Sequence, residues 1–250
     1  MQTFPPSFCP TSRRRLLAFA ATAATLPRGL AAQGTRLMAI DILLEPDQPM
    51  LDRAAADNAR LRANYPSGFA LDSAHTPHIT MLQLLVEAAD LPRIQDATAG
   101  VLASASPKDW RLTAAGRYYF PTDGLGLAGI TIRPTPELLA LQAAVIAAMA
   151  PFTRRGDTAG AFDGPDDPAV RATITAYIDG FATERAGRNY NPHVSTGLGR
   201  EAFVRAMVAE PFPPFEFGVA GAAIFHLGIY GTANRRLWTW APNAPSQRRG

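Results

Sequence analysis

The pattern of apolar and polar positions predicts a chain that mixes strands and helices. β-Branched and apolar runs predict strands at residues 36–44, 79–82, 111–133, 194–195 and 215–240. The run at 111–133 reads as a hairpin that turns at residues 121–124, and the run at 215–240 as two or three strands with a turn at 231–234. Helical spacing of apolar residues predicts helices at 49–64, 91–103, 135–150 and 201–209, and residues 170–182 fit either helix or strand.

Two further features concern packing. The helix at 135–150 is apolar on nearly every side, so we expect it to lie buried between two layers, with Thr135 as its N-terminal cap. Residues 154–168 are rich in Gly, Asp and Pro and predict an irregular segment, which we interpret as a mobile surface insertion in preference to a lid. Two aromatic pairs each share a strand face and can stack on a nucleobase, although packing in the core is favoured: Trp238 with Trp240, and Tyr118 with Phe120.

A repeated tetrapeptide gives the clearest indication of chemistry. Pro77-His78-Ile79-Thr80 returns 115 positions later as Pro192-His193-Val194-Ser195. In a strand, residues i and i+2 share a face, so each copy places an imidazole beside a hydroxyl. If the two strands face each other, one histidine can take a proton from the attacking oxygen of a phosphodiester while the other protonates the leaving oxygen. The hydroxyls can then bind the non-bridging phosphate oxygens.

These two His-x-Thr/Ser motifs, each with an apolar middle residue, resemble those of the 2H phosphoesterases, which include 2′-5′ RNA ligase-like and cyclic phosphodiesterase proteins. The resemblance implies an α+β fold of two similar lobes, each an antiparallel sheet backed by helices, related by a pseudo-twofold axis around a central cleft. It implies catalysis by His78 and His193 and phosphate binding by Thr80 and Ser195. The implied reaction opens 2′,3′-cyclic phosphates of nucleotides or short RNA ends, with no metal and no cofactor.

Other interpretations of these residues remain open. The same site can support 2′-5′ RNA ligase-like activity, or the chain can be a non-catalytic periplasmic nucleotide-binding protein. A metal site would combine His75 with the two motif histidines, although in a strand a spacing of three places His75 and His78 on opposite faces. Arg188 and Tyr190, just before the second motif, are candidates for phosphate or base contact. His226 lies in an apolar run and is expected to be a sheet histidine.

The first residues predict an export signal. Residues 12–17 read Ser-Arg-Arg-Arg-Leu-Leu, which matches the twin-arginine pattern, and a short apolar run and a small-residue cleavage site follow. We therefore expect residues 1–31 to be removed and residues 32–250 to form one domain of two lobes, located in the periplasm or secreted. Cys9, the one cysteine, would leave with the signal.

Removing the predicted signal also changes the charge of the chain. Residues 1–31 hold four arginines and no acid, so their loss takes the formal charge from +3 to −1. A nearly neutral protein lacks the net charge expected of a non-specific binder of long RNA or DNA. A small nucleotide or short oligonucleotide with a cyclic phosphate is the expected partner. After signal removal we expect no membrane association, and we expect a monomer.

Overall fold

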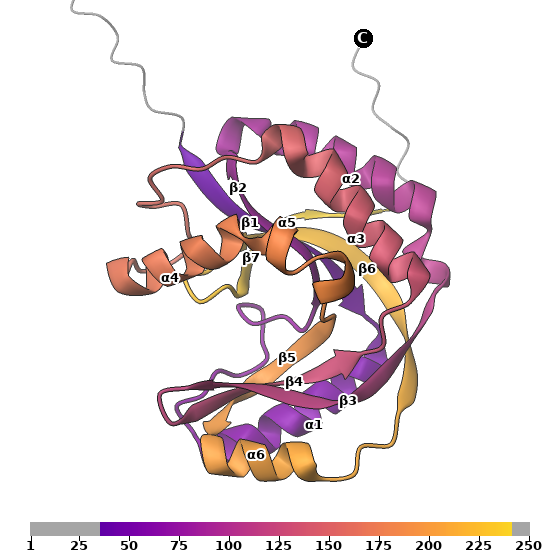
Figure 1. Ribbon diagram of the computed structural model, residues 1–250, viewed down its shortest axis with the longest axis vertical. Helices are drawn as coiled ribbons and strands as arrows, with labels where there is room; N and C mark the ends of the chain where they lie inside the picture. Colours follow the sequence, from indigo (N-terminus) through magenta and orange to yellow (C-terminus); the bar gives the residue numbers. More distant parts are fainter. Residues whose placement is uncertain (1–35, 242–250) are drawn as a thin grey trace, which may run out of the picture. The chain divides into compact units, whose positions relative to one another are not determined.

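The computed structural model describes residues 36–241, so the predicted export signal and Cys9 lie outside the described residues. This part of the chain is an α+β fold built on one seven-stranded antiparallel sheet (Figure 1), which confirms the predicted fold class. The strands are β1 (Leu37–Pro46), β2 (Ile79–Glu87), β3 (Arg111–Thr122), β4 (Leu125–Ile132), β5 (His193–Arg200), β6 (Phe215–Leu227) and β7 (Ala233–Thr239). Their order is β2-β1-β6-β3-β4-β5, and β7 also pairs with β6.

The long strand β6 joins two four-stranded halves of this sheet. Its residues 219–226 pair with β1, and its C-terminal part also pairs with β7. Its residues 215–218 pair with β3, so β6 continues into the half that contains β3, β4 and β5. In Figure 1, β6 curves from one half to the other. The two antiparallel halves predicted from the sequence are therefore present, but they share a strand.

Helices cover the two halves in an interleaved way. The helices are α1 (Gln48–Asn64), α2 (Leu91–Ala105), α3 (Pro136–Met149), α4 (Pro168–Asp179), α5 (Phe181–Glu184) and α6 (Glu201–Ala209), with short 3₁₀ turns η1 (Ala88–Asp90), η2 (Pro107–Asp109), η3 (Ala150–Phe152) and η4 (Gly187–Asn189). Although α1 follows β1, it packs on β5, and although α3 follows β4, it packs on α2 and β2. Each half is thus covered in part by a helix, α1 or α3, whose neighbouring strands in the chain belong to the other half.

Helix α3 differs from its prediction. Thr135 caps it as expected, because its hydroxyl accepts a hydrogen bond from the Leu138 amide at 3.2 Å. One face is buried, through Leu138, Leu141, Gln142, Val145 and Met149, while the alanines at 140, 143, 144 and 147 are exposed. The expectation of burial on all sides was wrong because alanine is small enough to lie in contact with water at little cost. The ambiguous residues 170–182 are helical, with Asp167 as the N-terminal cap of α4.

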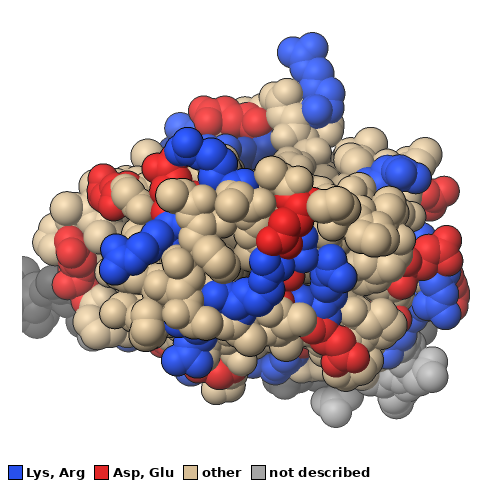
Figure 2. Space-filling view, turned by 90° about the horizontal axis from the view of Figure 1, so that it is seen from below, with Lys and Arg blue, Asp and Glu red and all other residues tan. Residues whose placement is uncertain are grey.

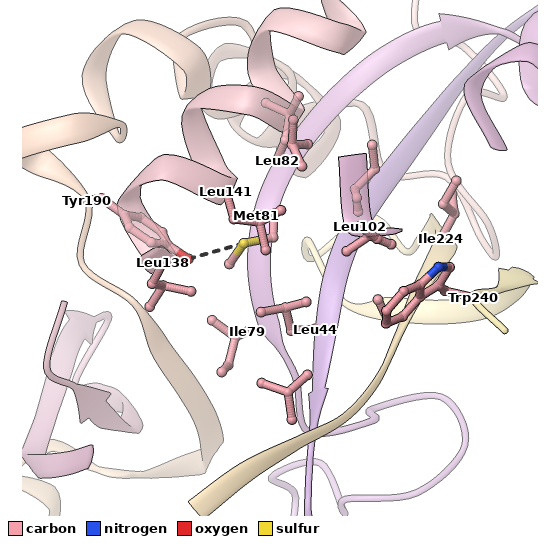
Figure 3. Close-up of a cluster of buried hydrophobic side chains, with 14 of the residues drawn as sticks. Leu44, Ile79, Met81, Leu82, Leu102, Leu138, Leu141, Tyr190, Ile224 and Trp240 are labelled. Atoms are coloured by element: carbon pink, nitrogen blue, oxygen red, sulfur yellow. Dashed lines mark hydrogen bonds between the residues drawn. The ribbon is translucent and has the colours of Figure 1, made fainter. Parts of the chain in front are cut away.

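The main hydrophobic core lies between the sheet and helices α2 and α3. Figure 3 shows part of it, in which Ile79 and Met81 of β2 lie among apolar side chains from several elements. Trp240 is also buried there, and Trp238 packs against the edge of the cluster. This tryptophan pair therefore belongs to the core, as the sequence favours.

The segment at 154–168 is irregular, as predicted, but it is built into the fold. The carbonyl of Ala161 accepts a hydrogen bond from the Ala39 amide of β1, and the Asp163 amide donates to the Leu227 carbonyl of β6, each at 2.8 Å. Ala161 and Phe162 are buried in a second, smaller core together with Ile178 of α4. The segment is therefore mostly exposed, as predicted, but the buried residues Thr158, Ala161 and Phe162 attach it to the sheet.

Charges on the surface are mixed in sign. On the face shown in Figure 2, basic and acidic side chains are interspersed. Among the described residues, no helix is both long enough and apolar enough to cross a membrane.

Candidate active site

The two repeated motifs are built in the same way. His78 directly precedes β2 and His193 is the first residue of β5, and both rings are half-buried. The Nδ1 atom of His78 lies 2.6 Å from the carbonyl oxygen of Thr76, and Nδ1 of His193 lies 2.7 Å from that of Asn191. A carbonyl can only accept, so Nδ1 carries a hydrogen in both rings. The Nε2 atoms are the ones left for chemistry.

The alternation predicted for each motif is present. The middle residues Ile79 and Val194 are fully buried, whereas Thr80 and Ser195 are half-buried like the histidines. This pattern follows from the strand, in which successive side chains point to opposite faces. Each motif therefore fixes its strand in the core through the middle residue and leaves an imidazole and a hydroxyl accessible on the other face.

The fold brings the two motifs together. Strands β2 and β5 stand at opposite ends of the strand order, yet they approach each other. The phenol of Tyr190, just before β5, donates a hydrogen bond to the Thr80 carbonyl of β2 at 2.8 Å. The charge of His78 also reaches His193 and influences its pKa. The expectation that the motif strands face each other agrees with this geometry.

An aspartate that the sequence analysis did not select lies beside the first motif. Asp41 of β1 is fully buried, and its Oδ2 accepts hydrogen bonds from Oγ1 of Thr80 at 3.0 Å and from Nε2 of Gln83 at 2.9 Å. Nε2 of His78 lies 3.4 Å from the same oxygen. One signal was available in the sequence, since Asp41 is the one charged residue in the apolar run 37–44. A buried acid in such a run requires a partner.

The surroundings of the two histidines give them opposite protonation tendencies. Burial alone would lower the pKa of His78, but the contact with Asp41 and its negative charge outweigh burial, and the pKa is raised. Burial is also the largest influence on His193, and it lowers the pKa of that ring. The hydrogen bond to Asn191 and, more weakly, the charge of Asp41 oppose this in part, and the charge of His78 lowers the pKa further. Near neutral pH, His78 is therefore the ring that more often carries a proton to donate, and His193 is the ring that is more often neutral and able to accept one.

A cross-strand row places an aromatic ring beside the second motif. Tyr118 of β3 lies opposite Gly129 of β4, which lies opposite Ser195 of β5. A Cβ atom on Gly129 would come within 2.5 Å of the Tyr118 ring, so the missing side chain lets this ring lie across β4. The ring meets His193 edge to face, with centroids 4.9 Å apart. Burial raises the pKa of the Tyr118 phenol well above its usual range, although a hydrogen bond with Ser195 opposes this in part.

Phe120 extends this aromatic surface outward. Its ring centroid is 6.2 Å from that of Tyr118, and 59% of the residue is exposed. Of the two aromatic pairs in the sequence, Tyr118 with Phe120 is therefore the one that lies beside the motifs.

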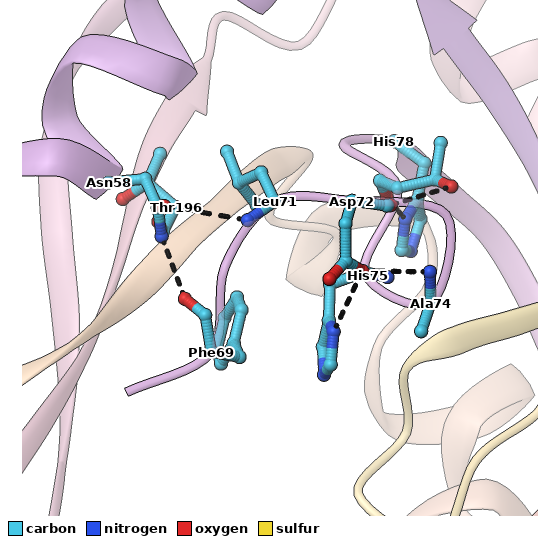
Figure 4. A network of polar contacts seen from close by, with 9 residues as sticks. Asn58, Phe69, Leu71, Asp72, Ala74, His75, His78 and Thr196 are labelled. Carbon is cyan, nitrogen blue, oxygen red and sulfur yellow. Dashed lines mark hydrogen bonds and ion pairs between the residues drawn. The ribbon is translucent and has the colours of Figure 1, made fainter. Parts of the chain in front are cut away.

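The loop that leads into the first motif is fixed by a polar network (Figure 4). Asn58 of α1 donates to the carbonyl of Phe69 in this loop at 3.0 Å and to that of Thr196 in β5 at 2.8 Å. Further along, Asp72 accepts from the amide of Ala74, and the ring of His75 stacks on Phe69 with centroids 4.7 Å apart. One helix side chain thus ties the approach to His78 directly to the strand that carries His193.

The other predicted residues lie in different settings. Tyr190 is buried and links the motif strands through its phenol, so it supports Thr80 where the sequence suggested contact with a ligand. Arg188 is exposed in η4. His226 is buried in β6, where Nε2 lies 2.8 Å from the Ala161 carbonyl and Arg235 contacts Nδ1, which agrees with the expectation of a sheet histidine.

The three histidines considered as metal ligands do not form one ligand set. Within residues 36–241, no group of three or more His, Cys, Asp or Glu side chains is arranged to hold a metal ion. His75 instead lies in the loop, with its Nδ1 atom 3.4 Å from Asp72.

A sequence model of the 2′-5′ RNA ligase superfamily matches residues 49–228, which is more than half of the chain. No curated protein matches the sequence significantly. Among solved structures, TT0787 of Thermus thermophilus is 15% identical over 83% of this chain and 100% of its own, with a TM-score of 0.48. LigT of E. coli is 13% identical over 82% and 98%, with a TM-score of 0.37. Usb1 of Kluyveromyces marxianus is 10% identical over 82% and 98%, with a TM-score of 0.38.

Proposed function

Because the chain belongs to the 2′-5′ RNA ligase superfamily, we propose that it is a phosphodiesterase that opens 2′,3′-cyclic phosphates of nucleotides or short RNA ends. One observation carries the proposal: two histidines with identical backbone anchoring have pKa values shifted in opposite directions. A pair of titratable groups poised in this way is what acid and base catalysis of one displacement requires.

In the proposed reaction, His193 is the base and His78 is the acid. Nε2 of His193 takes a proton from water as the water oxygen bonds to phosphorus. The bond from phosphorus to the 2′- or 3′-oxygen breaks, and that oxygen receives the proton of Nε2 in His78. A cyclic diester and water thereby become a monoester with a free hydroxyl. Each Nδ1 keeps its hydrogen and donates it to the backbone carbonyl, which keeps both rings oriented.

The motif hydroxyls hold the phosphate in this proposal, but not equally. Ser195 is half-buried and is hydrogen-bonded to the neutral phenol of Tyr118, which is a weaker acceptor than a carboxylate and is more easily replaced by a non-bridging oxygen. Thr80 already donates to Asp41 at 3.0 Å, so its hydrogen must turn away from the carboxylate to reach a phosphate. We therefore assign the larger share of phosphate binding to Ser195.

A small substrate fits the surroundings of the site. The half-buried Tyr118 and the exposed Phe120 offer ring faces to a nucleobase next to the phosphate. Charges of both signs on the surface in Figure 2 favour a nucleotide or short RNA end over a long nucleic acid. We extend the proposal to catalysis without a metal cofactor and to a monomeric protein located in the periplasm or secreted.

The decisive experiment incubates the purified protein with each of the four 2′,3′-cyclic nucleotides in the presence of EDTA. We expect a nucleoside monophosphate as product. Replacing His78 or His193 with alanine should lower turnover by about 10²–10⁴-fold, because each change removes a proton-transfer group. His75→Ala is the matched control, since this ring lies in the preceding loop, and it should retain turnover.

Each other outcome would contradict part of the proposal. Binding without product would favour a nucleotide-binding protein, and joining of RNA ends without hydrolysis would favour a ligase. Loss of activity in EDTA that zinc or manganese restores would favour metal catalysis. A histidine variant with nearly full turnover would exclude the two-histidine mechanism.

A further inference from the structure

We infer that Asp41 is a positioning residue that sets the different roles of the two motifs by holding both the imidazole of His78 and the hydroxyl of Thr80. This inference rests on the proposed function and deepens it. The two motifs have nearly the same sequence and the same backbone anchoring, so their own residues cannot make one histidine an acid and the other a base. A neighbour outside the motifs has to break the symmetry.

The sheet register brings Asp41 to the first motif. In the pairing of β1 with β2, Asp41 lies opposite Gln83, and a bulge after Ile42 places Leu43 opposite Thr80. Paired residues of antiparallel strands point to the same face, so Asp41, Gln83 and Thr80 share the face that carries the motif. The observed contacts agree, because Thr80 and Gln83 both donate to Oδ2 of Asp41.

Gln83 fixes the orientation of the carboxylate. Its amide nitrogen contacts Oδ2 of Asp41 at 2.9 Å and the carbonyl of Gly231 at 3.3 Å, so the side chain is held from two directions. Oδ1 of Asp41 is buried and has no hydrogen-bond partner within the described residues. The negative charge of the carboxylate is thus only partly neutralised by hydrogen bonds and acts strongly on the nearest cation.

That cation is His78. Asp41 is fully buried, and a buried carboxylate without a positive partner is strongly unfavourable. Within residues 36–241, the single ion-pair contact of Asp41 is to Nε2 of His78 at 3.4 Å. This separation is longer than a good hydrogen bond, so the hydrogen on Nε2 remains available to a leaving oxygen.

The other ionisable groups around this pair come from several elements. They are Glu45 of β1, His193 of β5, Tyr177 of α4 and Tyr190 ahead of β5. Burial raises the pKa of both phenols, which keeps them neutral, and Glu45 acts on His78 in the same direction as Asp41 but more weakly. Asp41 is therefore the group whose removal should change the protonation of His78.

The second motif has no equivalent of Asp41. Within the described residues, the ring of His193 contacts the Asn191 carbonyl and the edge of Tyr118, and no carboxylate is paired with it. Only neutral groups contact this ring, and although the charges of His78 and Asp41 both reach it, burial has the largest effect and favours the uncharged form. The carboxylate of Asp41 beside His78 and the phenol ring of Tyr118 beside His193 thus explain how one repeated sequence provides both an acid and a base.

The test is Asp41→Asn, which keeps the shape and removes the charge. The titration of each histidine is followed by NMR of ¹⁵N-labelled protein, with His78→Ala used to assign the signals. We expect the pKa of His78 to fall below that of the wild type, because burial then acts without the opposing charge. With a wild type that turns over cyclic nucleotides, the high-pH limb of the activity profile should lie at lower pH in Asp41→Asn. At a fixed pH on that limb, turnover should fall tenfold for each pH unit by which the limb moves.

Two further variants make the result specific. Asp57 is also buried, but it pairs with Arg117 at 2.7 Å, and Asp57→Asn should lower stability without moving either histidine titration. Gln83→Leu removes a donor from Asp41 and keeps the charge, so it should leave the pKa of His78 as high as in the wild type or higher. This variant tests the inference even if Asp41→Asn fails to fold.

The outcomes separate this inference from the proposed function. An unchanged titration of His78 in folded Asp41→Asn, or a lowered pKa in Gln83→Leu, would overturn the role of Asp41. The titrations need no substrate, so a wild type that opens no cyclic phosphate would contradict the proposed function and leave the test of Asp41 intact.

Discussion

At the scale of single residues, a proline before each histidine fixes the rings of the two motifs. The residue before a proline is biased towards an extended conformation, and in both motifs the carbonyl of that residue meets Nδ1 of the following histidine. This local arrangement is encoded in four consecutive residues, which is why the sequence predicts both histidines. The apolar run 37–44 indicates that Asp41 needs a partner, but only the pairing of β1 with β2 identifies the first motif as that partner.

The opposite pKa shifts of the two histidines predict a broad, bell-shaped dependence of turnover on pH. A base must be deprotonated to act. Because its pKa is lowered, His193 stays deprotonated at pH values below 6.5, the ordinary pKa of histidine. An acid must be protonated, and the raised pKa of His78 extends activity above that value. The residual activity of His193→Ala should lack the low-pH limb and that of His78→Ala the high-pH limb. Turnover measured from pH 4 to 10, on the order of one point per half unit, tests this; the opposite assignment of limbs would reverse the roles.

At the scale of elements, the hairpin of β3 and β4 connects strand pairing to the site. The alternating pattern predicted it, and its turn falls at Asp123 and Gly124, where both residues have positive φ. The contact of Tyr118 with the second motif could not be predicted from the pattern, because it depends on the alignment of three strands. The missing side chain at Gly129 is what allows that contact.

Substituting Gly129 should therefore affect the site through Tyr118. In Gly129→Ala, the new Cβ would meet the Tyr118 ring at 2.5 Å and the backbone oxygen of Val194 at 2.9 Å, so the ring beside His193 and the strand of the second motif must both shift. We expect turnover to fall by about tenfold or more, since small displacements of reacting groups are costly. Gly116→Ala is the matched control in the same hairpin, because its Cβ makes only an ordinary contact of 3.5 Å with Thr131. Equal turnover of the two variants at equal thermal stability would argue against a role for the Tyr118 ring.

At the scale of the whole molecule, the order of elements was predictable and their arrangement was not. Periodicity indicates where strands and helices occur, and the resemblance implies two halves. The interleaving of α1 and α3 between those halves depends on long-range packing. The burial of Ala161 and Phe162 in a segment rich in glycine and aspartate likewise depends on a second core that α4 completes. Composition therefore indicated an exposed segment but not the residues that attach it to the sheet.

The proposed location also concerns the molecule as a whole. We expect the mature protein to begin near Ala32, because the twin-arginine pattern at residues 12–17 precedes an apolar run and a small-residue cleavage site. N-terminal sequencing of periplasmic or secreted protein tests this, and replacing both Arg13 and Arg14 with lysine should abolish export. Cytoplasmic protein that retains both arginines in the unmodified chain would contradict the proposal.

The shared strand β6 has a consequence for how this site can evolve. It changes partners at Gly218, where Asp47 binds both the amide and the carbonyl of that residue, at 2.7 and 2.9 Å. The curvature of β6 at this point sets how the half carrying His78 is aligned with the half carrying His193. A misplacement of about 1 Å between reacting groups costs about 10²-fold in rate. In the proposed mechanism, the spacing of acid and base therefore depends on the bend of a strand that contains neither.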